Sequence, residues 1–276
     1  MSIVILRRRK LGRKSCRGIC EASETGIKCI RNDAAIPSNI DLLIRWGCTS
    51  TAHATKVLNK AEAIRAVGDK SGFRRVLNAH DLCPKTWFSL DATDFTYPLV
   101  IRPQVHAQGR KLHFCDTRAG LARAASMCGP GWYASEFIDK VAEYRVFVCQ
   151  GRAVWVTSKT PADPSTVAWN VAQGGRFDNV RWDDWPLKVV RISIEAFNLS
   201  GLDFGGVDVM VDRDGCCYVL EINSAPSQTS PYRQQCVAKA FEYIVRNGTD
   251  HIPLTPARGG YKKFIHPALT DQAIVA

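Results

Sequence analysis

The segment Gly205–Ser227 reads GGVDVMVDRDGCCYVLEINSAPS and has the pattern of a β-hairpin. Two runs rich in valine, isoleucine and leucine flank the turn-forming residues Asp212–Gly215. Carboxylates stand where such strands would carry apolar residues: Asp208 in the first run and Glu221 in the second. Asn223 follows Glu221 by two positions. Because side chains alternate along a strand, Glu221 and Asn223 share one face.

The length of the turn determines whether Asp208 joins that face. A two-residue turn, Arg213–Asp214, would pair Asp208 with Val219 and place it diagonal to Glu221. A three-residue turn with Gly215 in a bulge would instead place the side chain of Asp208 on the opposite face from Glu221. The sequence is compatible with both geometries.

Two carboxylates and an amide oxygen on one face would form a site for a hard cation. Mg²⁺, or alternatively Mn²⁺, fits such oxygen ligands and leaves its other positions to phosphate oxygens and water. We therefore predict a metal site made of Asp208, Glu221 and Asn223, and we expect it to be an unpaired acid cluster that is electrostatically costly without its ion. The alternative is a surface hairpin with scattered acids.

Further motifs precede the hairpin in a fixed order. They are the helical segment 69–77 with Lys70, the strand 97–103 with Arg102, the loop 106–110 with Gly109, the strand 132–138 ending in Glu136, Phe137 and Ile138, the strand 143–148 with Glu143 and Arg145, and the loop 170–175 starting at Asn170. In this order and spacing, the chain resembles the ATP-grasp superfamily over roughly residues 60–245. Within it, the chain is most similar to the amino-acid and peptide ligases, such as those that add glutamate to a protein C-terminus.

The resemblance implies a nucleotide site. Lys70 and Arg102 would clamp the phosphates, and Gly109 belongs to the loop that would cover them. Arg102 replaces the lysine that is usual in the family, which keeps the charge but changes its reach. The adenine would be held by the hinge residues Glu136, Phe137 and Ile138.

The resemblance also implies catalytic roles. Glu143 would bind the ribose, Arg145 would face the transferred phosphate, and Asn170 would help to hold the metal-bound phosphate. The alternative for Glu143 and Arg145 is a cross-strand ion pair that contributes little to stability. Related ligases carry an arginine just upstream of the asparagine, where this chain has Ala168–Trp169. Lys159 is the candidate to compensate for it.

The expected fold is α/β, an ATP-grasp fold in three parts. Residues 1–60 alternate strand and helix patterns, with nearly all-apolar strands typical of a parallel sheet, and would form a small N-terminal domain. Residues 61–137 would form the lid over ATP and residues 138–250 the catalytic subdomain. The tail 251–276 has no clear periodicity.

The composition bears on whether the chain spans a membrane and on the state of its cysteines. Hydrophobic residues make up 46% of the 276-residue chain, and no apolar run approaches the ~18 residues that span a bilayer. The eleven cysteines form no CxxC pair, so we expect reduced thiols and no structural zinc. The sequence also shows no pattern of a secretory signal, and we expect a cytoplasmic protein.

The net charge is +11, and seven basic residues with no acid fall within the first 17 positions. A solvated surface is the first interpretation of this run. A docking patch for an acidic substrate such as a peptide tail is the second. Nucleic-acid binding ranks last, because no aromatic residue precedes Trp46.

The resemblance therefore implies an ATP-dependent carboxylate–amine ligase. It would form an amide through an acyl phosphate and release ADP and phosphate. Its partners would be ATP, a carboxylate substrate (an amino acid or a peptide or protein tail) and an amine, with a homo-oligomer as an option. The alternatives are a kinase of the same fold and a nucleotide-binding regulatory protein without turnover.

Overall fold

The structure is a computed structural model that describes residues 2–7, 12–31, 36–37, 39–50, 54, 56–104, 112–163, 169 and 174–248. Several positions singled out above lie outside these residues: Gly109, Asn170, the basic positions 8–10 and the tail 251–276. In the described part, no helix has the length and apolar character needed to cross a bilayer. None of the eleven cysteines, all of which are described, forms a disulfide.

The N-terminal part is a parallel sheet with the strand order β2-β1-β3-β4. Its elements are β1 (Ile3–Arg7), α1 (Arg13–Glu21), β2 (Lys28–Arg31), β3 (Leu42–Trp46) and β4 (Val57–Leu58). Every residue of β1 and β3 is buried. The apolar strand pattern of the sequence thus corresponds to a parallel sheet, as expected.

Two helices follow, and then a small antiparallel sheet with the order β5-β8-β6-β7. The elements are α2 (Ala61–Gly68), α3 (Lys70–Ala79), β5 (Thr86–Trp87), β6 (Leu99–Arg102), β7 (His113–Cys115), α4 (Arg118–Cys128) and β8 (Tyr133–Glu136). Both α3 and α4 begin at a side-chain cap: Asp69 accepts a bond from the Gly72 amide, and Thr117 accepts one from the Gly120 amide. The cap at Asp69 is one that the sequence itself indicates, since an aspartate directly precedes the helical pattern.

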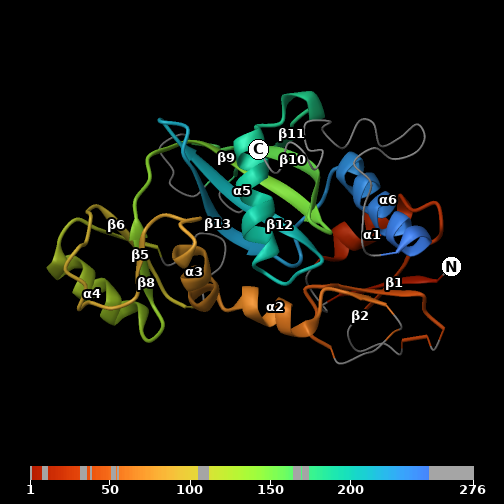
Figure 1. Cartoon of the computed structure of the whole chain (residues 1–276), viewed down its shortest axis with the longest axis horizontal. Coiled ribbons are helices and arrows are strands. Elements are labelled where there is room, and N and C mark those ends of the chain that lie inside the picture. Colours follow the sequence, from red (N-terminus) through yellow and green to blue (C-terminus); the bar gives the residue numbers. More distant parts are fainter. Residues whose placement is uncertain are drawn as a thin grey trace.

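The centre of the molecule is an antiparallel five-stranded sheet with the order β11-β10-β9-β12-β13. Its elements are β9 (Lys140–Cys149), β10 (Arg152–Thr160), β11 (Arg176–Asn179), the 3₁₀ turn η2 (Trp182–Asp184), α5 (Leu187–Asn198), β12 (Phe204–Asp212), β13 (Cys217–Asn223) and α6 (Pro231–Asn247). Figure 1 shows this sheet between the small sheet with α4 on one side and the N-terminal sheet on the other.

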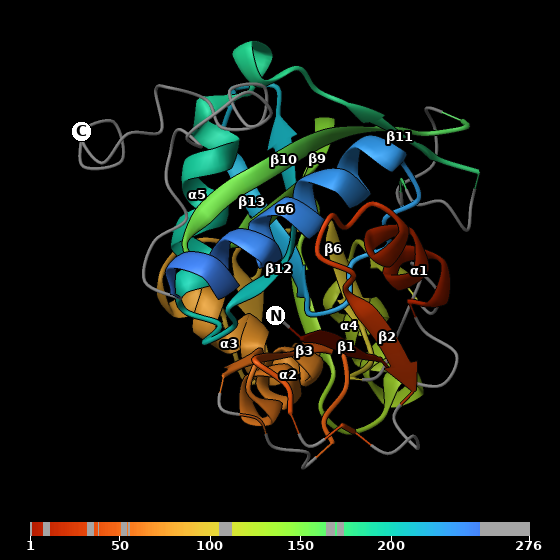
Figure 2. The same cartoon turned by 90° about the vertical axis from the view of Figure 1, so that its right-hand side faces the viewer.

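Helices α5 and α6 cover opposite faces of the central sheet (Figure 2). Val146 and Val148 of β9 share a core with α5, whereas the intervening Phe147 shares a core with α6. Alternation along the strands therefore divides the sheet into two faces. The three sheets follow the three parts expected from the sequence, and the boundaries at residues 60, 137 and 250 stay a prediction.

Candidate active site

The turn of the β12–β13 hairpin has three residues, Arg213–Gly215. The Asp212 amide donates to the Cys216 carbonyl (3.1 Å) and closes the turn. Gly215 has a φ of +75°, which glycine adopts without strain. This is the second of the two geometries compatible with the sequence. Taken alone, it would turn the side chains of the two predicted metal-binding acids to opposite faces.

A bulge in β13 brings the acids back to one face. Val209 pairs with Val219, but the next residue back along β12, Asp208, pairs with Glu221. Leu220 is therefore the extra residue, and such an insertion reverses side-chain parity beyond it. As a result, Asp208 and Glu221 lie directly opposite each other.

Arg74 of α3 holds this bulge from the open edge of β13. Its Nη1 donates to the carbonyl of Val219 (3.2 Å) and its Nη2 to the carbonyl of Leu220. The Val219 amide donates outward to the carbonyl of Leu82 (2.7 Å). Arg74 is only 5% exposed, so these contacts fix the irregular backbone in a buried setting.

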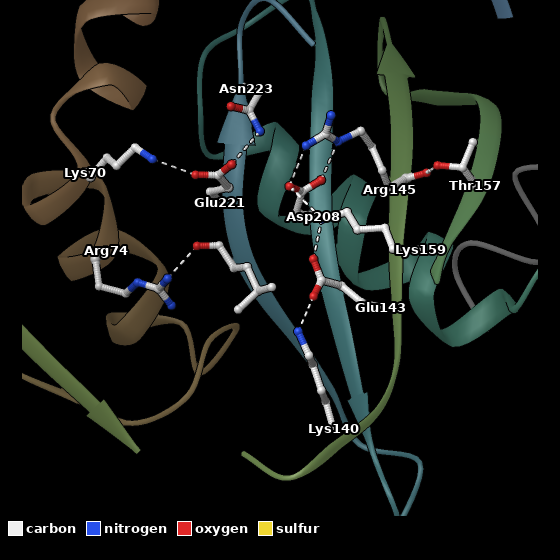
Figure 3. A network of polar contacts seen from close by, with 11 residues as sticks. Lys70, Arg74, Lys140, Glu143, Arg145, Thr157, Lys159, Asp208, Glu221 and Asn223 are labelled. Atoms are coloured by element: carbon white, nitrogen blue, oxygen red, sulfur yellow. Dashed lines mark hydrogen bonds and ion pairs between the residues drawn. The ribbon is translucent and has the colours of Figure 1, made fainter. Parts of the chain in front are cut away.

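The sheet register aligns Arg145 of β9, Asp208 of β12 and Glu221 of β13 in one row. Arg145 donates to both oxygens of Asp208, from Nε (2.5 Å) and from Nη2 (2.7 Å). On the outer side of the row, Lys70 Nζ donates to Glu221 Oε2 (2.7 Å), and Asn223 Nδ2 donates to Glu221 Oε1 (3.0 Å) (Figure 3). The three predicted metal ligands, the predicted catalytic residue Arg145 and the predicted phosphate-binding residue Lys70 thus lie together.

Two further lysines complete the network. Lys159 of β10 bonds to Glu143 and lies 3.0 Å from Asp208 Oδ2, and Lys140 bonds to the other oxygen of Glu143. Asp208, Glu143 and Lys159 are all almost fully buried. The expectation of an unpaired acid cluster was therefore wrong. Each acid already pairs with a cation from another strand or helix, which removes most of the cost of burying it.

Neighbouring charges favour the charged forms of Glu221 and Arg145, whereas burial acts against the charged form of Lys140. Burial alone would raise the pKa of Glu221, but Lys70, Asn223 and Arg145 outweigh it and hold that pKa far below its usual range. Burial acts against the charged form of Arg145 too, yet Asp208 raises its pKa above the ordinary value. Burial lowers the pKa of Lys140, with Glu143 opposing the shift.

The residues expected to hold the nucleotide lie on the side of the small sheet. Arg102 ends β6, donates from Nη1 to Ser135 Oγ (3.2 Å), and has a pKa lowered by burial. Glu136 ends β8, and its backbone amide donates to the carbonyl of Lys85 (3.0 Å). In the link to β9, the Phe137 amide donates to the Pro98 carbonyl (3.0 Å), and the Lys140 backbone amide donates to the Ile138 carbonyl (2.9 Å).

The donor set fits a magnesium ion that arrives with its nucleotide. No group of three or more His, Cys, Asp or Glu side chains in the described residues has the geometry to hold a metal. Two opposed carboxylates and one amide oxygen are what Mg²⁺ takes when phosphate oxygens and water supply the rest. Gly206 keeps the face clear: a Cβ there would come within 2.8 Å of Pro226 and 3.5 Å of Arg145.

A family model described as the RimK-like ATP-grasp domain matches residues 82–244, well over half of the chain. The chain belongs to this family. It is accordingly an ATP-dependent ligase that forms carbon–nitrogen bonds, with ATP and Mg²⁺ as its cofactors. No curated protein matches the sequence.

Solved structures support the same fold. The ATP-grasp ligase PsnB, complexed with a minimal precursor, has a TM-score of 0.63 and 12% identity over 90% of this chain and 100% of its own. D-alanine–D-alanine ligase from Bacillus anthracis, complexed with ATP, has a TM-score of 0.61 and 13% identity over 90% of this chain and 97% of its own. A RimK domain ATP-grasp protein from Sphaerobacter thermophilus has a TM-score of 0.60 and 15% identity, covering 88% of this chain and all of its own.

Some residues of this site were not predicted from the sequence. Arg74 carries no motif signal of its own, although it lies one helical turn after Lys70 and so faces the same way. Lys140 was also missed, three residues before Glu143. Lys159, expected only as a substitute for an absent arginine, stands at the centre of the network between two acids.

Proposed function

We propose that the ligase activates a substrate carboxylate by phosphorylation. A carboxylate oxygen attacks the γ-phosphorus of ATP, the bond to the β–γ bridging oxygen breaks, and ADP leaves. An amine then attacks the carbonyl carbon of the acyl phosphate, phosphate departs, and the amine loses a proton. The carboxylate belongs to an amino acid or to a peptide or protein tail, and the reaction takes place in the cytoplasm.

The observation that carries this proposal is the row Arg145–Asp208–Glu221 with Lys70 at its end. Phosphoryl transfer needs positioned charge more than covalent chemistry from the protein. Arg145 is held rigidly by both oxygens of Asp208, so it can face the transferring group without reorganising. Lys70 and Arg102 reach the same region from α3 and β6 and would hold the phosphates.

Asp208, Glu221 and Asn223 would hold Mg²⁺. When bound, the ion neutralises charge on phosphate oxygens. Lys70 pairs with Glu221 when the ion is away, and it is placed to turn to phosphate oxygens when the ion binds. Lys140 and Lys159 occupy both oxygens of Glu143, so binding of ribose by Glu143 would require Lys140, the more exposed of the two, to give way.

Hydroxylamine trapping tests the proposal. With Mg-ATP and a pool of amino acids and acidic peptides, an acyl phosphate should yield a hydroxamate together with ADP. Arg145→Ala should abolish trapping and leave some ATP binding. A stable phosphorylated product without hydroxamate would identify a kinase of the same fold, and AMP in place of ADP would contradict the phosphoryl-transfer scheme.

A further inference from the structure

Three cysteine thiols meet where helix α1 packs against β2, far from the ATP-grasp motifs in the sequence (Figure 2). Cys16 and Cys20 lie four residues apart in α1 and therefore point to the same side of the helix. Cys29 lies in β2, and all three residues pack on the same apolar core. The thiols of Cys16 and Cys20 both donate hydrogen bonds to the Cys29 sulfur.

The Cys29 sulfur has a third donor, Arg7, at the end of the neighbouring strand β1. The parallel register places Arg7 two residues beyond the partner of Cys29, so both side chains share a face. The two helix thiols and the guanidinium of Arg7 lower the pKa of Cys29 to about 3, although burial opposes the shift. Hydrogen bonding to Cys29 and burial raise the pKa of Cys16 and Cys20, and Glu21 adds to the shift at Cys20. The proton therefore leaves Cys29 first.

Access to the cluster is limited to two of its members. Cys29 and Cys20 are partly exposed, whereas Cys16 is fully buried. Strand β2 lies at the edge of its sheet, which leaves one side of Cys29 without a neighbouring strand. Hydroperoxides oxidise cysteines that are both deprotonated and accessible, and Cys29 meets both conditions.

We propose that Cys29 is a site of oxidation by hydroperoxides and that Cys20 is its disulfide partner. The Cys29 sulfur attacks hydrogen peroxide, the O–O bond breaks, and a sulfenic acid and hydroxide form. The Cys20 sulfur then attacks the Cys29 sulfur, the S–O bond breaks, and the hydroxyl group leaves. With the protons from the two thiols, one peroxide is reduced to two waters while the two sulfurs are oxidised to a disulfide. The step does not depend on the ligase activity.

Cys20 is the better placed of the two possible partners. A disulfide requires sulfurs about 2.0 Å apart, so the partner must move toward Cys29. Cys20 lies in the last turn of α1, which adjusts at lower cost than the close-packed core that holds Cys16 beside Ile19 and Trp46. Loss of the thiol proton before attack also costs less at a partly exposed sulfur than at a buried one.

Peptide mass spectrometry tests the pairing on the full-length chain. Reduced protein is treated with a low excess of hydrogen peroxide, the remaining thiols are blocked with iodoacetamide, and the protein is digested. Trypsin cuts after Arg17 and Lys28 and so releases the three cysteines in separate peptides. The main cross-link should join the peptides of Cys20 and Cys29, and dithiothreitol should remove it. Oxidation that leaves Cys29 reduced, or a main cross-link from Cys29 to Cys16, overturns the proposal.

Variants separate the two steps. Cys20→Ala should stop at the sulfenic acid of Cys29, which dimedone traps, and Cys29→Ala should give neither the cross-link nor the adduct. Cys29→Ser serves the same comparison if the alanine variant does not fold. Cys216→Ala, which removes an exposed thiol elsewhere, is the matched control and should form the cross-link as wild type does. Loss of the cross-link in Cys216→Ala, or a dimedone adduct at another cysteine in place of Cys29, overturns the proposal.

The pH dependence of alkylation gives a readout that needs no oxidant. Between about pH 5 and pH 7, the rate of reaction of iodoacetamide with Cys29 should change by less than about twofold, because the group is already deprotonated. N-acetylcysteine in the same solution, with an ordinary thiol pKa near about 8.5, should react about a hundredfold faster at the higher pH. An increase of that size at Cys29 would show an ordinary thiol and overturn the proposal.

Discussion

The two faces of the central sheet are made by the same strands and yet depend on different physics. On the face toward α5, valines from β9, β12 and β13 pack into a core, and each contributes by burial alone. On the other face, Arg145, Asp208 and Glu221 depend on their partners in neighbouring strands. We therefore expect the apolar face to tolerate losses one residue at a time, and the charged row to depend on all of its members.

The largest effect should come from Asp208→Ala. It leaves Arg145 and Lys159 buried without their shared acid, so the free energy of unfolding should fall by about 3–5 kcal/mol. ADP release should fall by about 10²-fold or more, because a preorganised charge is lost. Urea denaturation and an ADP assay measure the two quantities.

The control for this prediction removes both partners. Asp208→Ala combined with Arg145→Met removes the guanidinium that Asp208→Ala alone would leave unpaired. Part of the lost stability should therefore return, while ADP release should stay as low as in Asp208→Ala or fall further. If Asp208→Ala alone kept the stability and turnover of wild type, the charged face would not act as a unit.

Val209→Ala probes the opposite face one residue away. Val209 is fully buried in the core under α5, and its truncation should cost about 2 kcal/mol through lost burial and a small cavity. The Mg²⁺ concentration for half-maximal activity should not change, because the side chain points away from the acids. A large rise in this concentration would show that the two faces are not independent.

Arg74→Met tests whether the bulge places the acids. Two hydrogen bonds to the Val219 and Leu220 carbonyls are lost, each worth about 0.5–1.5 kcal/mol. Mn²⁺ binding in the presence of ADP, followed by electron paramagnetic resonance, should weaken by about threefold to tenfold. The neighbouring Arg75→Met, whose guanidinium lies over the Phe88 ring, should bind Mn²⁺ as wild type does. Equal binding in both variants would mean that the sheet alone holds the bulge.

The smallest effect should come from the helix caps. Asp69→Ala and Thr117→Ala each remove one cap, of α3 and α4 respectively, at a cost of about 1 kcal/mol. Because α3 carries Lys70 and Arg74 to the metal-binding strand and α4 does not, only Asp69→Ala should also raise the KM for Mg-ATP. A similar rise in Thr117→Ala would assign the change to general loss of stability.

Much of this protein follows from its sequence. The parallel strands near the N-terminus, the cap at Asp69 and the hairpin with its three metal-binding candidates are local patterns, and the structure has all of them. The order of the motifs indicated the family that the comparison then showed. These features could be predicted because periodicity, capping and turn chemistry act between residues close together in the chain.

Only the tertiary structure decided how the charges meet. The turn residues are compatible with either parity, and the shared face of Asp208 and Glu221 depends on a bulge at Leu220 that Arg74 holds from a distant helix. Lys70 and Glu221 are 151 residues apart in the sequence and meet only in the folded chain. Alternation repeats along a strand and can be read locally, but the energy of a buried charge depends on what surrounds it in space, which the chain specifies only after it has folded.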